Sequence, residues 1–300
     1  MNDVLNGIPE FVEAVEAGGF SAAAARMNLS RSAVGKTIAK LEKRLSVRLF
    51  HRTTRMQSLT EEGQAFYERC RRALDEIQSG EAMLESGKRE VAGRLRISMP
   101  VLFGRRCVSP LLMELAREHP NLELDLSFSD RIVDLIDEGF DLAIRNGPLP
   151  DAPGLVTRRV ARHRMVVCAS PAYLARRGTP RAIADLHEHD LIAYARAGEA
   201  KIWVFPQADG ADIEYMPKTR LRFDDLEAMA DAAAAGMGAA WLPCWLIRDQ
   251  VHAGRLAPVL TDLSGLTFHA YAVWPQTPHL PLKTRAVIDL LAARLPQVVE

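Results

Sequence analysis

The chain has 300 residues, of which 48% are apolar, and its 38 basic side chains balance its 38 acidic ones. This length and apolar content allow two or three domains with hydrophobic cores and exclude an intrinsically disordered chain. The first 20 residues lack an apolar run behind a basic end, and no run approaches the roughly 18 apolar residues of a membrane-spanning helix, so we expect a cytoplasmic protein with no signal peptide and no membrane partner.

A first helix is predicted over residues 3–17. Its apolar residues fall on one side at helical spacing: Leu5, Ile8, Phe11, Val12 and Val15. Gly18 and Gly19 follow, and glycine commonly ends a helix because it accepts left-handed backbone angles. We expect this helix to complete the core of a small N-terminal domain.

Residues 21–45 have the pattern of two helices joined by a tight turn. Ser21 is suited to cap a short alanine-rich helix that ends near Met27, and Ser30 is suited to cap a second helix that runs to about Leu45. The small alanines allow the first helix to lie close to its neighbour. This arrangement predicts a helix-turn-helix unit.

The second of these helices has two different faces. Its apolar residues recur at intervals of four, three and four, which predicts one buried stripe: Val34, Ile38, Leu41 and Leu45. Ser32, Lys36 and Lys43 point the opposite way, at about 100° per residue. The stretch from Arg26 to Arg55 is strongly basic, with Glu42 as its one carboxylate. One face therefore packs, and the other is free to enter a major groove.

Two short extended segments are predicted after this helix, at residues 49–51 and 57–59. Arg52, Thr53, Thr54 and Arg55 join them and would form a basic wing. A solvated, charged helix pair in an ordinary globular protein is the alternative, because most charge runs are of that kind. The caps, the opposed faces and the basic wing together favour double-stranded DNA as the partner.

The segment that carries these features resembles the N-terminal winged helix-turn-helix of the LysR-type transcriptional regulators. The resemblance covers about sixty continuous residues, from Phe11 to Tyr67, and includes the run FVEAVEAGGFSAAAARMNLSRSAVGKTIAKLEKRLSVRLF. It implies a bacterial repressor or activator that binds an interrupted palindromic promoter site as a dimer or a larger assembly. It also implies control by a small-molecule inducer, with RNA polymerase as a possible further partner.

Nine residues of this domain are expected to contact DNA. Arg31, Ser32 and Lys36 would read bases, while Arg52, Thr53 and Arg55 would hold phosphates or enter the minor groove. The complete expected set is Ser21, Arg31, Ser32, Lys36, Lys40, Arg52, Thr53, Thr54 and Arg55.

A long helix is predicted over residues 60–90, and it carries a heptad seam. Apolar and small residues recur at intervals of four and three: Phe66, Cys70, Ala73, Ile77, Gly80 and Leu84. Such a narrow stripe on a charged helix favours dimerisation through Phe66, Cys70, Ala73, Ile77 and Leu84, as in the linker helices of the family. Packing of the stripe against its own chain is the alternative.

Strands and helices alternate from Arg94 onward, which predicts an α/β domain with parallel sheets. Strands are expected at 95–98, 122–128, 142–145, 165–169, 191–194, 221–223, 239–242 and 268–274. Helices are expected at 103–118, 131–138, 225–235 and 282–295.

Four segments of this region resemble the LysR-type effector domain: GRLRISMPVLFGRRCVSPLL, LIDEGFDLAIRNG, VVCASPAYLARRGTP and FDDLEAMADAAAAGMGAAWLP. The resemblance implies two Rossmann-like subdomains of the periplasmic-binding-protein type, and a tetramer as the default assembly. The implied domains are a winged helix-turn-helix at 1–59, a linker and dimerisation helix at 60–90, and an effector domain at 91–300. Within the effector domain, subdomain I comprises 91–161 and 266–300, and subdomain II comprises 162–265.

An inducer site is predicted beyond the carboxyl ends of the strands, where open parallel sheets bind ligands. Arg145 would supply the charge for a small carboxylate, and Phe223 would supply an apolar surface. The expected site residues are Ser98, Pro100, Val101, Ser129, Arg145, Asn146, Phe223 and Asp224. The alternatives are that Ser98 only caps a helix, that Arg145 pairs with Asp141 or Asp224, and that Phe223 belongs to the core.

Other chemistry has little support in the sequence. The four cysteines are far apart and are read as free, mostly buried thiols, with a redox sensor as the alternative. His187 and His189 lie close together on an expected loop, and Gly236-Met237-Gly238 lacks the context of a dinucleotide site. We therefore expect no metal, no other cofactor and no enzyme, with a small-molecule binding protein as the competing class.

Overall fold

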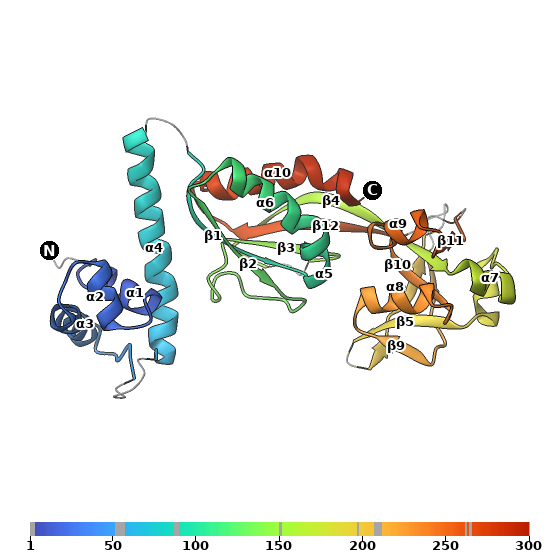
Figure 1. Cartoon of the computed structure of the whole chain (residues 1–300), viewed down its shortest axis with the longest axis horizontal. Coiled ribbons are helices and arrows are strands. Elements are labelled where there is room, and N and C mark those ends of the chain that lie inside the picture. The colour runs from blue at the N-terminus through green and yellow to red at the C-terminus, as the bar shows by residue number, and fades with distance from the viewer. Residues whose placement is uncertain are drawn as a thin grey trace.

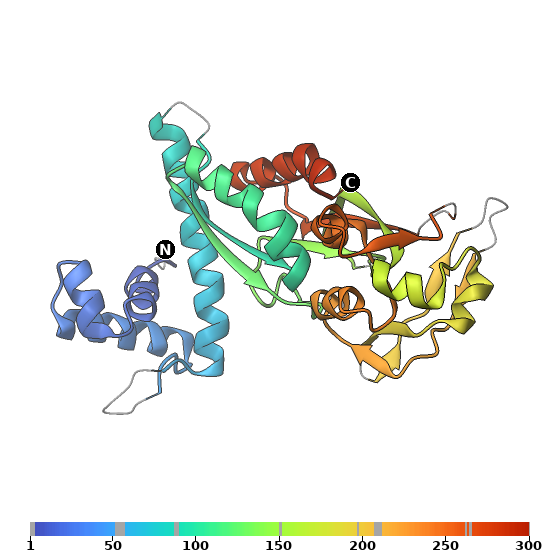
Figure 2. The same ribbon diagram turned by 45° about the vertical axis from the view of Figure 1, so that its right-hand side comes forward.

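The computed structural model describes residues 4–51, 58–86, 90–149, 152–196, 198–206, 212–261, 263 and 266–299. A small helical unit at the N-terminus is followed by the long helix α4 (Glu61–Ser86) and then by two lobes that contain β-sheet. Both views place the helical unit on the opposite side of α4 from these lobes (Figure 1, Figure 2). The predicted fold class, helix-turn-helix followed by an α/β effector domain, is confirmed.

The helical unit contains α1 (Ile8–Glu16), α2 (Phe20–Arg26) and α3 (Arg31–Leu45). Helix α1 begins later than predicted, because the chain before it turns through Gly7 at a φ of 85°. The prediction that Ser21 caps α2 is wrong, since Ser21 lies inside that helix and Gly19 precedes it. The cap predicted at Ser30 is confirmed: its Oγ accepts a hydrogen bond from the Ala33 amide at 3.1 Å.

The described parts of the two extended segments predicted after α3 lie side by side. Phe50 and Leu59 form an isolated antiparallel bridge, and the His51 amide donates to the Ser58 carbonyl at 2.9 Å. The proposed DNA contacts Arg52, Thr53, Thr54 and Arg55 lie outside the described residues.

Helix α4 packs its first turns against the helical unit. The Phe66 ring lies 5.7 Å from the Phe11 ring, and Cys70 is only 5% exposed within the same core. Cys70 is therefore covered by its own chain and Phe66 is half-buried against it, as the alternative interpretation of the heptad pattern expects for these two residues. Ala73 and Ile77 are exposed, as is Gly80 further along the helix. The side chain of Leu84 lies outside the described part of the molecule.

The first lobe has a mixed sheet in the order β2-β1-β3-β12-β4. Strands β1 (Gly93–Met99), β2 (Leu122–Phe128) and β3 (Leu142–Asn146) are parallel, while β12 (Thr267–Pro275) and β4 (Leu155–Ala169) join antiparallel. Helices α6 (Ser109–Glu118) and α10 (Leu282–Val299) pack their apolar faces into the core of this lobe. The sheet is therefore mixed: its parallel part was expected, and the antiparallel pairing of β12 and β4 was not.

Two predicted helices of the first lobe differ in the structure. The helix expected at 103–118 is divided into α5 (Val101–Phe103), a π-helical turn (Gly104–Val108) and α6. Residues 131–134 are irregular and residues 135–138 form turns, so no helix is present here. The Asp134 carboxylate there accepts the amides of Ile136 and Asp137, both at 2.9 Å, and such side-chain bonds compete with helix formation.

The second lobe continues the sheet through β10 (Ala239–Pro243), β5 (Leu191–Arg196) and β6 (Glu199–Ala200), with β9 (Leu221–Phe223) and β11 (Ala257–Val259) at its sides. A separate hairpin pairs β7 (Trp203–Phe205) with β8 (Ile213–Tyr215). The helices of this lobe are α7 (Pro171–Arg177), a 3₁₀ turn (Ile183–Glu188), α8 (Leu226–Ala234) and α9 (Cys244–His252).

Strands β4 and β12 join the two lobes. Strand β4 pairs with β12 over residues 155–164 and with β10 over residues 165–168, so one strand belongs to both lobes. Across the described ranges, no helix has both the length and the apolar composition needed to cross a bilayer.

Candidate DNA interface and effector cleft

Helix α3 separates an apolar face from a basic one. Val34, Ile38 and Leu41 are buried in the helical core, as the spacing predicts. Four of the residues expected to contact DNA are exposed on the same helix: Arg31, Ser32, Lys36 and Lys40. Ser21 is exposed at the start of α2. Figure 1 places α3 at the end of the molecule remote from the two lobes, where a long partner has access to it.

The one carboxylate of the basic stretch is occupied within the protein. Glu42 accepts the Leu49 amide at 2.7 Å and the Phe50 amide at 3.2 Å, and it lies 3.7 Å from the Arg48 guanidinium. Within the described ranges, Arg31, Lys36 and Lys40 make no ion pair. The exposed face of α3 therefore keeps its positive charge, and Glu42 instead holds the start of the wing. The sequence pattern identified Glu42 as a carboxylate in the basic stretch, but it did not show that Glu42 binds the amides of Leu49 and Phe50.

A cleft of about 1560 Å³ lies between the two lobes. Six of the eight residues predicted for an effector site line it: Pro100, Val101, Ser129, Arg145, Asn146 and Asp224. The other two do not. Ser98 is fully buried behind Arg145, and Phe223 packs beside the core under α8, so its alternative assignment to the core describes it better.

Arg145 is a partly buried cation on the wall of this cleft. Its Nη2 donates to Ser98 Oγ at 2.9 Å and its Nη1 donates to the Ile144 carbonyl at 2.7 Å. Among the described residues it has no carboxylate at ion-pair distance; in particular, Asp141 accepts the Arg96 amide at 2.8 Å instead. Burial lowers the pKa of Arg145, although Asp130 opposes this effect, and a guanidinium remains charged throughout.

The lobes are also tied together across the cleft. Glu227 of α8, in the second lobe, pairs with both Arg105 and Arg106 of the first. Arg105 and Glu227 both line the cleft. Separation of the lobes therefore breaks the ion pairs of Glu227. A ligand that moves the lobes apart must overcome these ion pairs, whereas one that brings the lobes together preserves them.

An aromatic cluster that the sequence analysis missed lines the same cleft. The His163 ring stacks on Phe268, with centroids 5.9 Å apart and an interplanar angle of 16°. Phe103 lies 5.9 Å from His163 and 5.5 Å from Trp245. These four residues come from α5, β4, α9 and β12, so no local sequence pattern could reveal them.

Three polar atoms in the cleft wall are buried without a hydrogen-bond partner among the described residues: Asn146 Oδ1, His163 Nδ1 and Trp245 Nε1. His163 is 5% exposed, and burial, assisted by the neighbouring His269, lowers its pKa to about 4. The imidazole is therefore neutral at pH 7.

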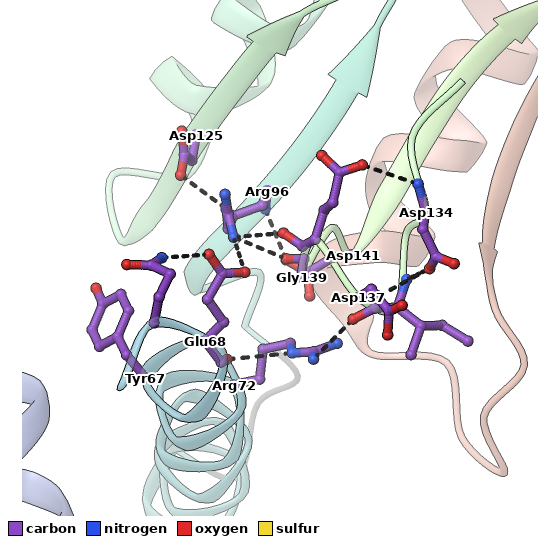
Figure 3. A network of polar contacts seen from close by, with 12 residues as sticks. Tyr67, Glu68, Arg72, Arg96, Asp125, Asp134, Asp137, Gly139 and Asp141 are labelled. Atoms are coloured by element: carbon purple, nitrogen blue, oxygen red, sulfur yellow. Dashed lines mark hydrogen bonds and ion pairs between the residues drawn. The ribbon is translucent and has the colours of Figure 1, made fainter. Parts of the chain in front are cut away.

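A polar network connects the first lobe to α4 (Figure 3). Arg96 Nη1 on β1 donates to Glu68 Oε2 of α4 at 3.2 Å and to the carbonyls of Glu138 and Gly139 at 3.1 and 3.3 Å. Arg72 Nη2 of α4 donates to the Ile136 carbonyl at 3.2 Å. Residues 129–136 also line the cleft. The segment 129–139 therefore contacts both the cleft and the long helix.

The structure gives no support to the other sequence features. Burial raises the pKa of Cys70 to about 11 and the pKa values of Cys107 and Cys168 to about 12, so these thiols stay protonated and unreactive. In the part of the chain that the structure describes, no group of three potential metal ligands comes together. His189 is instead 3.2 Å from the Tyr173 hydroxyl.

Comparisons with family models match both parts of the chain. Residues 5–64 match the bacterial regulatory helix-turn-helix protein, lysR family, and residues 88–296 match the LysR substrate binding domain.

Curated relatives and solved structures match over almost the whole length. The chain is 32% identical over 281 residues to the HTH-type transcriptional activator AaeR of Escherichia coli, covering 94% of this chain and 90% of the relative. It is 31% identical over 286 residues to the HTH-type transcriptional regulator CrgA of Neisseria meningitidis, covering 95% of each. The solved structure of CrgA superposes with a TM-score of 0.61 at 30% identity, covering 96% of this chain and 98% of that one. A full-length AphB variant gives a TM-score of 0.61 at 26% identity, covering 98% and 99%.

Proposed function

Because the chain belongs to the LysR family of DNA-binding transcriptional regulators, and is not an enzyme, we propose that it binds an interrupted palindrome in a promoter under the control of a small molecule in its cleft. The observation that carries the DNA part is the exposed face of α3, which bears basic residues and no neutralising carboxylate. Because the proposed partner is promoter DNA, we propose that the protein acts in the cytoplasm of a bacterial cell.

Each of the nine residues has a proposed role at the DNA. Arg31, Ser32 and Lys36 read base edges from α3, and Lys40 contacts the phosphate backbone nearby. Ser21 contacts a phosphate from the start of α2. Arg52, Thr53, Thr54 and Arg55 act from the wing, as the family resemblance suggests. Two-fold symmetry then requires half-sites about one helical turn or more apart.

Dimerisation is proposed along the outer part of α4. Ile77 is 41% exposed, and Ala73 and Gly80 leave small exposed positions to either side of it. A partner helix that covers this stripe would remove apolar surface from water. Leu84 would continue the stripe. Two such dimers would form a tetramer. At an activated promoter, RNA polymerase would be a further partner. The domain limits 1–59, 60–90 and 91–300 stay a prediction.

The effector part of the proposal assigns a small carboxylate to Arg145. An unpaired, partly buried guanidinium gains most from an anion that forms two parallel hydrogen bonds. Binding at Val101, Ser129 and Arg145 would shift the segment 129–139, which also contacts Glu68, Arg72 and Arg96 near α4. The effector would thereby alter the position of the DNA-binding unit and the spacing or bending of the bound DNA.

Footprinting of the purified protein on DNA upstream of its own gene, at several salt concentrations, tests this function. We expect protection of an interrupted palindrome, with an affinity that falls steeply as salt rises. Absence of binding even at low salt would contradict the proposal and favour a small-molecule binding protein.

A further inference from the structure

The cleft offers two separate features that a ligand could complement: a cation without a carboxylate partner among the described residues, and two ring nitrogens without a hydrogen-bond partner there. One is the Arg145 guanidinium on β3. The other is a pair of ring nitrogens in the aromatic cluster, His163 Nδ1 and Trp245 Nε1. Buried polar groups are costly unless they are hydrogen-bonded, so the ring nitrogens are suited to a ligand that supplies the missing partner. Arg145 already donates two hydrogen bonds, and it is suited to a ligand that supplies a negative charge.

The two sets are well separated along the sheet. Arg145 pairs with Tyr271 on β12, whereas His163 pairs with Phe268 on the same strand. Three residues of strand correspond to about 10 Å. A register shift between Ala270 and Tyr271 interrupts the alternation of β12, and both Phe268 and Tyr271 line the cleft. A ligand that reaches both sets must therefore be elongated.

The aromatic end is suited to an uncharged group. His163 is neutral at pH 7 and is surrounded by Phe103, Trp245 and Phe268, so an ion there would lose its hydration without meeting an opposite charge. The Trp245 nitrogen can only donate, whereas a neutral imidazole nitrogen can accept. The centroids of the His163 and Trp245 rings are 6.2 Å apart. A single hydroxyl group of a ligand can therefore accept a hydrogen bond from Trp245 and donate one to His163.

We propose that the cleft binds an elongated aromatic acid whose carboxylate pairs with Arg145 and whose uncharged hydroxyl, at the far end of the ring, bonds to His163 and Trp245. The aromatic ring of the ligand packs against Phe268. This inference rests on the proposed function only in taking the cleft as the effector site, and it adds the chemistry at both ends of the effector.

Calorimetric titration of the full-length protein with three related probes tests the assignment. The probes are 4-hydroxycinnamate, cinnamate, which lacks the hydroxyl, and 4-hydroxycinnamamide, which lacks the charge. We expect 4-hydroxycinnamate to bind about tenfold or more tightly than either analogue. His163→Phe should remove the preference for the hydroxyl and keep the preference for the carboxylate. Arg145→Gln should do the reverse.

Trp245→Phe provides a second variant at the aromatic end, and circular dichroism checks that each variant is folded. If the hydroxyl preference survives in both His163→Phe and Trp245→Phe, or if none of the probes binds, the assignment is overturned. Footprinting of the same preparations separates this result from the proposed function. A protein that binds its operator but none of the probes refutes the ligand alone, whereas one that binds 4-hydroxycinnamate but no DNA refutes the regulator.

Discussion

Arg96 on β1 donates to Glu68 on α4 at 3.2 Å, and this ion pair joins the effector lobe to the helix that carries the DNA-binding unit. The same guanidinium holds the carbonyls of Glu138 and Gly139, at the end of the segment that begins in the cleft. The Arg96 side chain therefore contacts both the segment that lines the cleft and helix α4, so a movement of either one affects the other.

Glu68→Gln should loosen this connection. Loss of one charge-assisted hydrogen bond at a partly buried site costs about 1–2 kcal/mol. We expect amide hydrogen exchange in residues 134–139 to become roughly tenfold faster, without global unfolding. Glu62→Gln, at an exposed position six residues earlier on α4, is the matched control. Equal exchange in the two variants would show that the ion pair does not restrain the segment.

Arg145→Gln should leave the stability nearly unchanged or raise it slightly. The wild-type guanidinium is partly buried and has no carboxylate at ion-pair distance in the described structure, so its removal relieves a desolvation cost that offsets the loss of its bonds to Ser98 and Ile144. Arg96→Gln, which removes the partner of Glu68 and Asp125, should cost about 2–3 kcal/mol. Urea denaturation of both variants measures the difference. A comparable loss for Arg145→Gln would mean that this arginine is structural and not reserved for a ligand.

The neutral His163 should make the effector domain less stable in acid. Its pKa is about 4 in the folded protein and about 6.5 when unfolded, so the unfolded chain binds a proton first as the pH falls. The contribution is fully present above about pH 6.5 and is lost as the pH falls toward 4, and its upper limit is about 3 kcal/mol.

Urea denaturation at about pH 7 and about pH 4.5 measures this effect. His163→Phe should reduce the pH dependence, whereas His279→Phe, at an exposed position, should retain it. An unchanged pH dependence in His163→Phe would exclude His163 as its source.

Ile77→Glu should weaken self-association. A charge in the middle of the exposed stripe of α4 would be buried by a partner helix without compensation, which raises the dissociation constant by about tenfold or more. Met216→Glu adds the same charge at a residue that is 55% exposed in the second lobe, and it should leave the assembly unchanged. Sedimentation equilibrium distinguishes the two. An Ile77→Glu protein as oligomeric as Met216→Glu would remove this stripe from the interface.

Local patterns predicted the N-terminal unit well because its helices are short-range structures. The spacing of Val34, Ile38 and Leu41 identified the buried face of α3, and the side chain of Ser30 identified its start. The helix expected at 131–138 failed because Asp134 bonds to nearby amides, an interaction that helix periodicity does not represent. In the same way, the heptad spacing of α4 did not tell which neighbour covers Phe66 and Cys70.

The cleft was predicted only in part, because it is a property of the tertiary fold. Arg145 and Asn146 follow from the rule that ligands bind beyond strand ends. His163 was missed because β4 was expected to begin at Met165, although Arg162 and Arg164 are exposed on either side of the buried His163. That alternation was visible in the sequence. Its proximity to Phe103 and Trp245 was not, since these residues are far apart along the chain.

The most direct test of the central claim, that α3 reads DNA, compares Lys36→Gln with Lys218→Gln on the footprinted operator. Both lysines are exposed, and the two changes remove the same charge, so only their positions differ. We predict that Lys36→Gln loses about 1–3 kcal/mol of operator binding, while Lys218→Gln binds like the wild type. Equal affinities of the two variants for the operator would contradict the assignment of α3 as the recognition helix.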